Sequence, residues 1–137
     1  MNYTELKTNI QDICETTFTD DLLAMFTKQA EQKIFNSVQI PALRKNVTAA
    51  VTSGNTFLST PSDFLHAYSL SVTDSSGDFN FLLNKDVNFI REAYPATSPG
   101  GLPVHYALFT DGTILLGPTP DSNYAVELHY GFYPESI

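Results

Sequence analysis

The side chains best suited to covalent chemistry are one cysteine, Cys14, and three histidines, His66, His105 and His129. Nucleophilic catalysis needs a nucleophile, a base and an orienting group that meet in space. No GxSxG turn or other activating motif surrounds a serine. Cys14 lies in a stretch with helical spacing, where a free cysteine is usually a packing residue. The sequence therefore predicts a packing role for Cys14 and no enzyme activity.

The sequence motifs that could indicate a metal or phosphate site are equally weak evidence. The histidines are far apart, and the sequence contains no HxxxH or CxxC spacing. The acidic turn DSSGD, residues 74–78, lacks the ligand series and the closing glutamate of a calcium loop, so we interpret it as a solvated turn. The glycine-rich stretch Ser98–Gly101 precedes a predicted strand, whereas a phosphate cradle precedes a helix. We therefore expect no metal and no cofactor.

Composition limits the remaining classes. The chain of 137 residues has a net charge of −8 and only seven Lys and Arg residues, whereas a face that binds nucleic acid needs clustered cations. Its charged fraction of 16% is low for a small domain, which indicates that a partner covers part of the surface. We expect no secretory signal, no membrane span and a reducing compartment for the single cysteine.

The elements that would position these side chains begin with two helices. Apolar residues recur at helical spacing over residues 4–15. A second helix is expected to begin after Thr19, whose side chain can cap it. The sequence thus predicts a helical segment over residues 1–40. Such a helical pair is too small to stand alone and must pack on something.

Alternating patterns predict strands after Pro41. In LHAYSLSV, residues 65–72, we expect the odd-numbered side chains on one face and the even-numbered side chains on the other. A helix over about residues 84–94, with Asn84 as its cap, interrupts the strands and ends before Pro95. In the last strand Tyr124 and the alternate residues through Phe132 are expected to face the core.

These elements together predict an α+β fold. The N-terminal helical pair packs on an antiparallel β-sheet or small β-sandwich, residues 41–137, which carries the one inserted helix. The whole is expected to form one compact domain.

Two stretches combine into an ordered signature. LSTPSDFLHAYSLSV, Leu58–Val72, is followed by the predicted helix and then by Gly101–Ile137, which contains GLPVHY, a hairpin, GPTPD and a tyrosine-rich strand. In this order and spacing the chain resembles the head–tail adaptor (connector or neck) proteins of tailed bacteriophages, especially those of short-tailed phages. The resemblance covers nearly the whole chain, including the upstream helices and IPALRKNVTAAV.

The resemblance implies a structural virion protein. Such adaptors form a ring, commonly of twelve copies, bound under the portal at one capsid vertex. The ring extends the DNA channel and forms the platform for tail or nozzle proteins. Its implied location is the virion neck, after synthesis in the cytoplasm of the host bacterium. Genomic DNA would pass through without specific binding, which agrees with the acidic balance of the chain. Family members usually continue into further helices that contact the portal, whereas this sequence ends at Ile137.

Two short segments are candidate contacts with neighbouring subunits. Arg44 and Lys45 form the one adjacent basic pair, at the predicted junction of helices and strands, and their alternative role is a solvated strand start. The loop Pro95–Pro103 has no predicted structure of its own, and such loops are often functional. Its candidate contact residues are Ser98, Pro99, Gly100 and Gly101.

Three alternatives stay open at this point. The first is a neck or tail-completion protein of a long-tailed phage, which differs from an adaptor mainly in its position in the virion. The second is a carbohydrate-binding β-module, which would need exposed, coplanar tyrosines, whereas Tyr124 and Tyr130 lie on the predicted core face. The third is a small hydrolase, which no motif supports.

Overall fold

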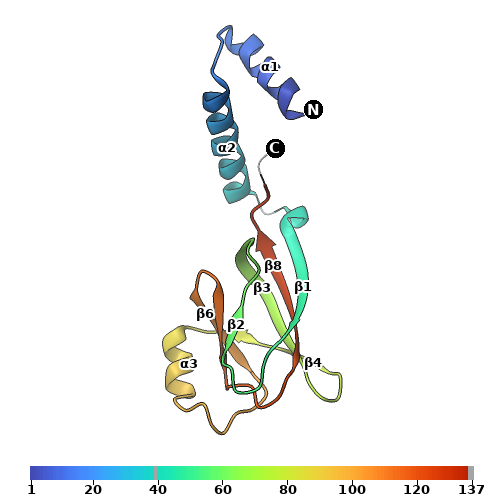
Figure 1. Ribbon diagram of the computed structural model, residues 1–137, viewed down its shortest axis with the longest axis vertical. Helices are drawn as coiled ribbons and strands as arrows, with labels where there is room; N and C mark the ends of the chain where they lie inside the picture. The colour runs from blue at the N-terminus through green and yellow to red at the C-terminus, as the bar shows by residue number, and fades with distance from the viewer. Residues whose placement is uncertain (39, 136–137) are drawn as a thin grey trace. The chain divides into compact units, whose positions relative to one another are not determined.

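The computed structural model describes residues 1–38 and 40–135, and the chain divides into two compact units. One unit comprises Met1–Leu43 together with Tyr133–Ile137, and the other is Arg44–Phe132. Figure 1 shows helices in the first unit and mainly strands in the second. The last two residues of the predicted signature, 136 and 137, lie outside the described residues. Each unit is described by itself below.

The helical unit contains α1, Tyr3–Cys14, and α2, Asp20–Ser37, followed by a short 3-10 helix, Pro41–Leu43. A capping box starts α1, because Asn2 Oδ1 accepts a hydrogen bond from the Glu5 N–H at 2.9 Å and the Glu5 carboxylate accepts one from the Asn2 N–H at 3.0 Å. None of the described helices combines the length and apolar character that a bilayer crossing requires.

Two predictions for the helical unit are wrong. Thr19 occupies the N-cap of α2, but its side chain makes no capping hydrogen bond. The carboxylates of Asp20 and Asp21, in the first turn, favour the positive end of the helix dipole instead. Cys14 is exposed rather than packed, because α1 buries none of its residues within the described chain.

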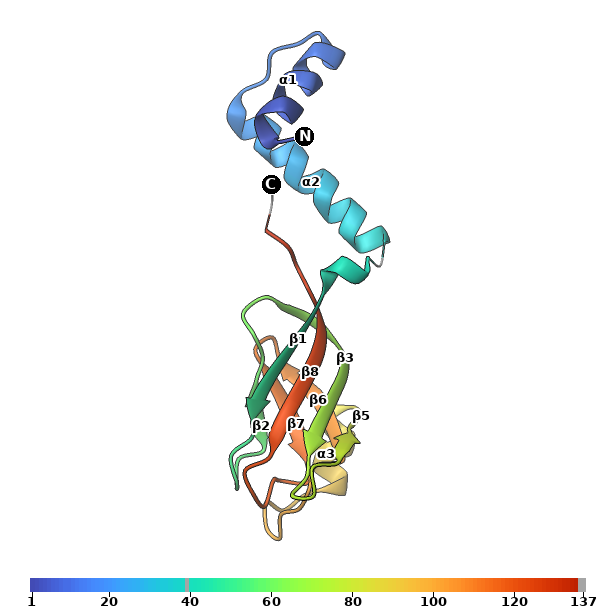
Figure 2. The same ribbon diagram turned by 90° about the vertical axis from the view of Figure 1, so that its right-hand side faces the viewer.

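The second unit is a sandwich of two four-stranded sheets. The first sheet has the order β1 (Arg44–Ala50), β8 (Ala125–Phe132), β3 (Phe64–Thr73) and β4 (Phe79–Phe81), with every neighbouring pair antiparallel. Figure 2 shows β8 between β1 and β3. The second sheet has the order β2 (Phe57–Ser59), β7 (Thr113–Gly117), β6 (His105–Thr110) and β5 (Leu83–Asn84). The predicted α+β class is confirmed.

The core lies between the two sheets. Period-2 alternation places the apolar side chains of β8 on one face, as predicted, and they meet side chains from the second sheet. Tyr130 is 4% exposed, which excludes it from any exposed tyrosine platform. The buried residues of this cluster are Val51, Leu58, Leu70, Val72, Leu82, Tyr106, Ile114, Leu116, Val126, Leu128 and Tyr130.

A β-bulge in β3 overturns the predicted facing of residues 65–72. The pairing of β3 with β8 shifts between Ala67 and Ser69. Before the shift His66 faces away from the core, and after it the even-numbered Leu70 and Val72 face inward. One extra residue therefore reverses the phase of the alternation. Tyr68 is left on the outer face of the sheet.

The inserted helix α3, Val87–Ala93, covers the outer side of the second sheet through Ile90, which packs on Ala107 and Leu115. Its N-cap is Asp86, whose carboxylate accepts a hydrogen bond from the Asn88 N–H at 3.1 Å. The predicted cap, Asn84, instead ends β5. This strand pairs with β6 in parallel, the one parallel strand pair among the described residues, whereas an antiparallel sheet was predicted.

Candidate interaction surfaces

The predicted basic pair is split between two faces of the first sheet, because successive residues of a strand point in opposite directions. Arg44 lies on the outer face, with its guanidinium 4.4 Å from the centre of the Tyr68 ring. The Tyr68 ring lies 4.6 Å from that of His66 and 5.6 Å from that of His129. These four residues, Arg44, His66, Tyr68 and His129, form an aromatic–cation cluster that spans β1, β3 and β8.

The cluster depends on a glycine beneath it. A Cβ atom at Gly131 would lie 2.5 Å from Cε1 of His66, a distance that requires the ring to move. No sequence pattern predicts this cluster, because the bulge that turns Tyr68 outward is not visible in a pattern of alternation. Arg44 therefore has a partner in its own unit, and its predicted contact with a neighbouring subunit stays a prediction.

Lys45 points to the other side and joins a polar contact at the edge of the core. Its Nζ lies 2.5 Å from Oδ2 of Asp63 and 4.0 Å from the centre of the Phe132 ring. The Tyr130 hydroxyl donates to the other carboxylate oxygen of Asp63 at 2.9 Å.

These contacts shift the pKa values of Asp63 and Tyr130 in opposite directions. Hydrogen bonds from Lys45 and then from Tyr130 lower the pKa of Asp63 below its ordinary value. Burial, followed by the bond to Asp63, raises the pKa of Tyr130. Both effects favour a charged Asp63 beside a neutral Tyr130. Lys45 therefore has a partner in its own unit, and its predicted contact with a neighbouring subunit stays a prediction.

The loop 95–103 is held by a second loop from elsewhere in the chain. The Gly101 N–H donates to the Thr119 carbonyl oxygen at 2.8 Å, and Gly101 forms a bridge with Pro120. A Cβ atom at Gly100 would lie 2.7 Å from the Thr119 oxygen, so only glycine permits this approach. The two candidate glycines thus hold the loop in place.

The other two candidate residues of this loop remain available to a partner. Ser98 and Pro99 are exposed, with a cis peptide bond between them. Their contact with a neighbouring subunit is not tested by the fold and stays a prediction.

One end of the sandwich is acidic. Because Thr73 pairs with Ala125, the turn after β3 and the loop before β8 lie at the same end of the sheet. This end carries the carboxylates of Asp74, Asp78 and Asp121, and neither the turn nor the loop contains Lys or Arg. The Tyr124 hydroxyl bonds to Asp121, and this bond is the main reason why the pKa of Tyr124 is raised. Arg44 lies at the opposite end, since it pairs with Gly131.

Exposed aromatic and aliphatic side chains form patches on the sandwich. Phe79, Phe81 and Leu83, which follow one another at alternate positions, are 60%, 68% and 57% exposed. A second patch includes Phe57 and Phe109, whose ring centres are 5.4 Å apart, with the Arg91 guanidinium 5.3 Å from the centre of the Phe109 ring. Patches of this kind usually mark surfaces that bind other proteins.

The helical unit is also incompletely buried. Leu23 and Thr27 are the buried residues of its long helix α2 within the described chain. A groove of about 390 Å³ runs along the two helices and is lined almost wholly by carbon. The residues that line this helical groove are Leu6, Ile10, Phe26, Thr27, Ala30, Glu31 and Ile34.

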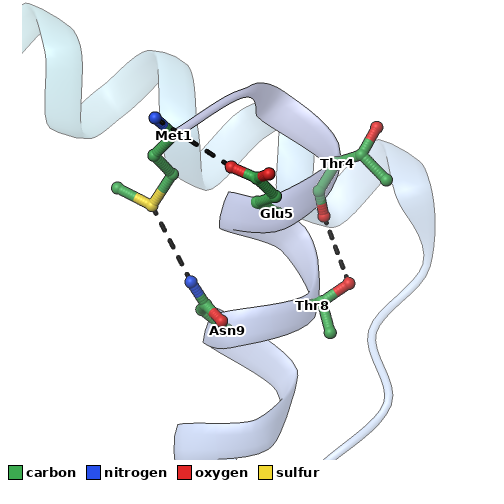
Figure 3. Close-up of a pocket in the computed structure, with 5 residues that line it drawn as sticks. All are labelled: Met1, Thr4, Glu5, Thr8 and Asn9. Atoms are coloured by element: carbon green, nitrogen blue, oxygen red, sulfur yellow. Dashed lines mark hydrogen bonds and ion pairs between the residues drawn. The ribbon is translucent and has the colours of Figure 1, made fainter.

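A hollow beside the N-terminus has no convergent chemistry. Figure 3 shows its polar groups bonded along α1 rather than directed at a common point. The amino terminus lies 3.9 Å from the Glu5 carboxylate, the Thr8 hydroxyl donates to the Thr4 carbonyl oxygen, and the Asn9 amide contacts the Met1 sulfur. This hollow is therefore lined by the N-terminus and α1, and it brings no polar groups to a common point.

The residues considered for chemistry are also dispersed. His105 accepts or donates a hydrogen bond with the Tyr94 hydroxyl at 2.8 Å, while His66 and His129 belong to the aromatic–cation cluster. In the part of the chain that the structure describes, no three His, Cys, Asp or Glu side chains gather closely enough to hold a metal ion. Within residues 1–38 and 40–135, the side chains considered for chemistry therefore do not converge, and the features suited to contact with other proteins are the apolar patches and the helical groove.

A family model described as SU10 adaptor protein matches residues 1–137, which is the whole chain. No curated protein gives a significant match.

Proposed function

Because the chain belongs to the SU10 adaptor protein family of phage head–tail adaptors, we propose that its copies form a ring bound under the portal. The family is one of structural phage proteins and is not known as enzymatic. The family's association with phage portal and tail components supports a location in the virion neck. The match over the whole chain is the observation that carries the proposal.

The ring would extend the DNA channel and form a platform for tail or nozzle proteins. Exposed apolar patches on the sandwich and the helical groove support this role, because a subunit that contacts several partners needs more than one apolar interaction surface. We propose that the ring contains twelve copies of the chain. Each copy is made in the cytoplasm of the host bacterium before it joins the virion.

Genomic DNA would slide through the ring without specific binding. The net charge of −8 and the acidic end of the sandwich support this part of the proposal. A negative wall repels the phosphate backbone, whereas clustered Lys and Arg would hold it. The proposal therefore predicts a net negative channel lining.

The proposal is tested by measuring the native mass of the purified protein, alone and mixed with the portal protein of the same phage. We expect the mixture to contain a complex whose mass exceeds that of the portal by a whole multiple of 15.1 kDa, the multiple being twelve. Because assembly can require the portal as a template, a monomer in the absence of portal is compatible with the proposal.

Two controls sharpen the measurement. An unrelated acidic protein of similar mass should add nothing to the portal, which excludes nonspecific association. If the chain stays monomeric with portal present and instead adds mass to a purified distal tail component, the adaptor proposal is contradicted.

A further inference from the structure

After its first two residues, strand β1 is an open sheet edge without the features that usually prevent edge pairing. It has seven residues and is the longest of the four edge strands of the sandwich. Proteins usually blunt such edges with charges, prolines, bulges or very short strands. The stretch from Asn46 to Ala50 contains no charge and no proline, and its register with β8 is regular.

The hydrogen-bond phase shows which backbone groups of β1 are free for pairing. The Val51 N–H donates to the Tyr124 carbonyl oxygen at 2.9 Å, so in the register of β1 with β8 the odd-numbered residues make the ladder bonds. The N–H and C=O groups of Asn46, Thr48 and Ala50 therefore point away from β8. Their side chains lie on the outer face of the sheet, opposite those of His129, Glu127 and Ala125.

The other edge strand of the same sheet is β4. Its backbone also leaves alternate N–H and C=O groups free to pair with an added strand. The Asp74 N–H donates to the Asp78 carbonyl oxygen at 3.1 Å, and the Leu82 N–H donates to the Leu70 oxygen at 2.8 Å. In this register the backbone groups of Phe79 and Phe81 point away from β3. Their side chains also lie on the outer face, and they are among the most exposed apolar side chains of the sandwich.

The directions of the two edges are compatible as well. Each neighbouring strand pair of the sheet is antiparallel, so β4 runs opposite to β1. In a ring whose axis follows the strands, neighbouring copies have the same orientation, and β4 of one copy meets β1 of the next in an antiparallel arrangement. Directly opposed residues of antiparallel strands share a face. Phe79 and Phe81 would then lie beside Asn46 and Thr48, with the outer face continuous.

We propose that the first sheet continues from copy to copy, with β4 of one subunit pairing with β1 of a second copy of this chain. This inference rests on the proposed ring and identifies the contact between its subunits. The pairing satisfies backbone groups on both edges and covers two exposed phenylalanines with uncharged side chains.

A groove under β1 supports the same contact. It has a volume of about 170 Å³ and opens where β1 and β2 leave the two sheets unjoined. The Thr60 hydroxyl in this groove is buried and has no hydrogen-bond partner among the described residues. A strand added to β1 would lie over this opening, whereas on the other side the chain itself passes from one sheet to the other through Leu82.

Cysteine crosslinking of the full chain tests the proposal. In a Cys14→Ser background, Phe79→Cys is combined in turn with Asn46→Cys, Thr48→Cys and Ala50→Cys. Each protein is oxidised both concentrated alone and mixed with the portal protein. Opposed residues in such a ladder have Cα atoms about 5.5 Å apart, which a disulfide can span. We expect at least one pair to give a ladder of dimers, trimers and larger species, while each single variant stays monomeric.

A matched control replaces Phe79→Cys by Phe89→Cys, an exposed phenylalanine on α3 that is 41% exposed. This control should give no ladder. The absence of a ladder from all three test pairs in the mixture with portal overturns the proposal. Crosslinked dimers from Thr48→Cys alone also overturn it, because they would show β1 pairing with β1 about a two-fold axis.

A backbone variant separates edge pairing from mere proximity. Thr48→Pro removes an N–H that points away from β8, so the internal ladder is retained and proline is tolerated at this edge. In the pair Asn46→Cys with Phe81→Cys, which are opposed when Phe79 lies beside Thr48, we expect Thr48→Pro to reduce crosslinking at least tenfold and Thr48→Val to leave it unchanged. Equal crosslinking in both, with equal melting temperatures, would overturn the proposal.

The outcomes distinguish this contact from the adaptor role. A portal complex that contains twelve copies but gives no ladder would leave the function in place and exclude the β1–β4 contact. A ladder without any portal binding would establish the contact and contradict the adaptor function.

Discussion

Asp63 contacts both a charged side chain and a residue of the hydrophobic core. Its carboxylate forms an ion pair with Lys45 and accepts a hydrogen bond from the buried Tyr130. Both contacts lower the pKa of Asp63. The folded state therefore binds a proton at Asp63 less readily than the unfolded state does. The carboxylate contributes stability that is present above the unfolded pKa of about 3.9 and is lost as the pH falls through the folded pKa.

We expect Asp63→Asn to melt at a lower temperature than the wild type at pH 7. The difference should stay constant down to about pH 5 and close as the pH falls below about 4. Thermal unfolding between pH 2 and pH 7 measures this, with Asp111→Asn, in the exposed turn between β6 and β7, as the control. A difference that persists unchanged at pH 2 would show that Asp63 acts by shape and not by charge.

Gly117 is the residue at which the end of β7 meets α3. A Cβ atom there would lie 2.5 Å from Cδ2 of Tyr94 and 2.9 Å from Cγ2 of Ile90. We expect Gly117→Ala to reduce the free energy of unfolding by about 1–3 kcal/mol, the usual cost of an overpacked core. Urea unfolding measures the change.

Gly112 provides the matched control for that substitution. A Cβ atom at Gly112 meets nothing within 4 Å, so Gly112→Ala should change stability by no more than about 0.5 kcal/mol. Equal stability losses in the two variants would contradict the packing explanation for Gly117.

At the scale of elements, the loop 95–103 depends on its contact with the loop before β8. Gly100→Ala should push the Thr119 carbonyl away and weaken the hydrogen bond from Gly101, which is worth about 1 kcal/mol. Amide hydrogen exchange at Gly101 should then accelerate about fivefold, while amides in β8 keep their protection. Unchanged exchange at Gly101 would show that the two loops are not coupled.

The strands with regular alternation could be predicted from the sequence because burial alone sets their pattern. Val126, Leu128 and Tyr130 face the core as expected. The bulge in β3 could not be predicted, since one extra residue shifts the facing of Tyr68 without leaving a turn residue or glycine at that point. The parallel pairing of β5 with β6 depends on a chain crossing at Leu82 that no local pattern records.

The candidate surfaces were only partly visible in the sequence. The sequence predicts Gly100 and Gly101 as contacts with a neighbouring subunit, but their partner Thr119 lies in a distant loop, so their role in holding the loop is visible only in the fold. Arg44 and Lys45 are adjacent in the sequence, whereas strand geometry places them on opposite faces. The match between the β1 and β4 edges follows from hydrogen-bond phase, which a sequence does not contain.

At the scale of the whole molecule, the net charge determines whether the protein binds DNA. The net charge of −8 and the acidic end of the sandwich predict no measurable binding of a duplex of about 20 base pairs at physiological salt. Fluorescence anisotropy of a labelled duplex measures this, with a basic DNA-binding domain as the positive control. Binding in the micromolar range or tighter would contradict a channel that DNA passes without adhering.

The central claim is that copies of this chain form a ring under the portal. The most direct test is an electron cryo-microscopy reconstruction of the tail vertex of the phage, calculated without imposed icosahedral symmetry. Our account predicts a ring of twelve sandwiches directly beneath the portal, around a negatively charged channel. A reconstruction that places the chain in the capsid shell or a tail fibre, or that shows a bore lined by Lys and Arg, would contradict it.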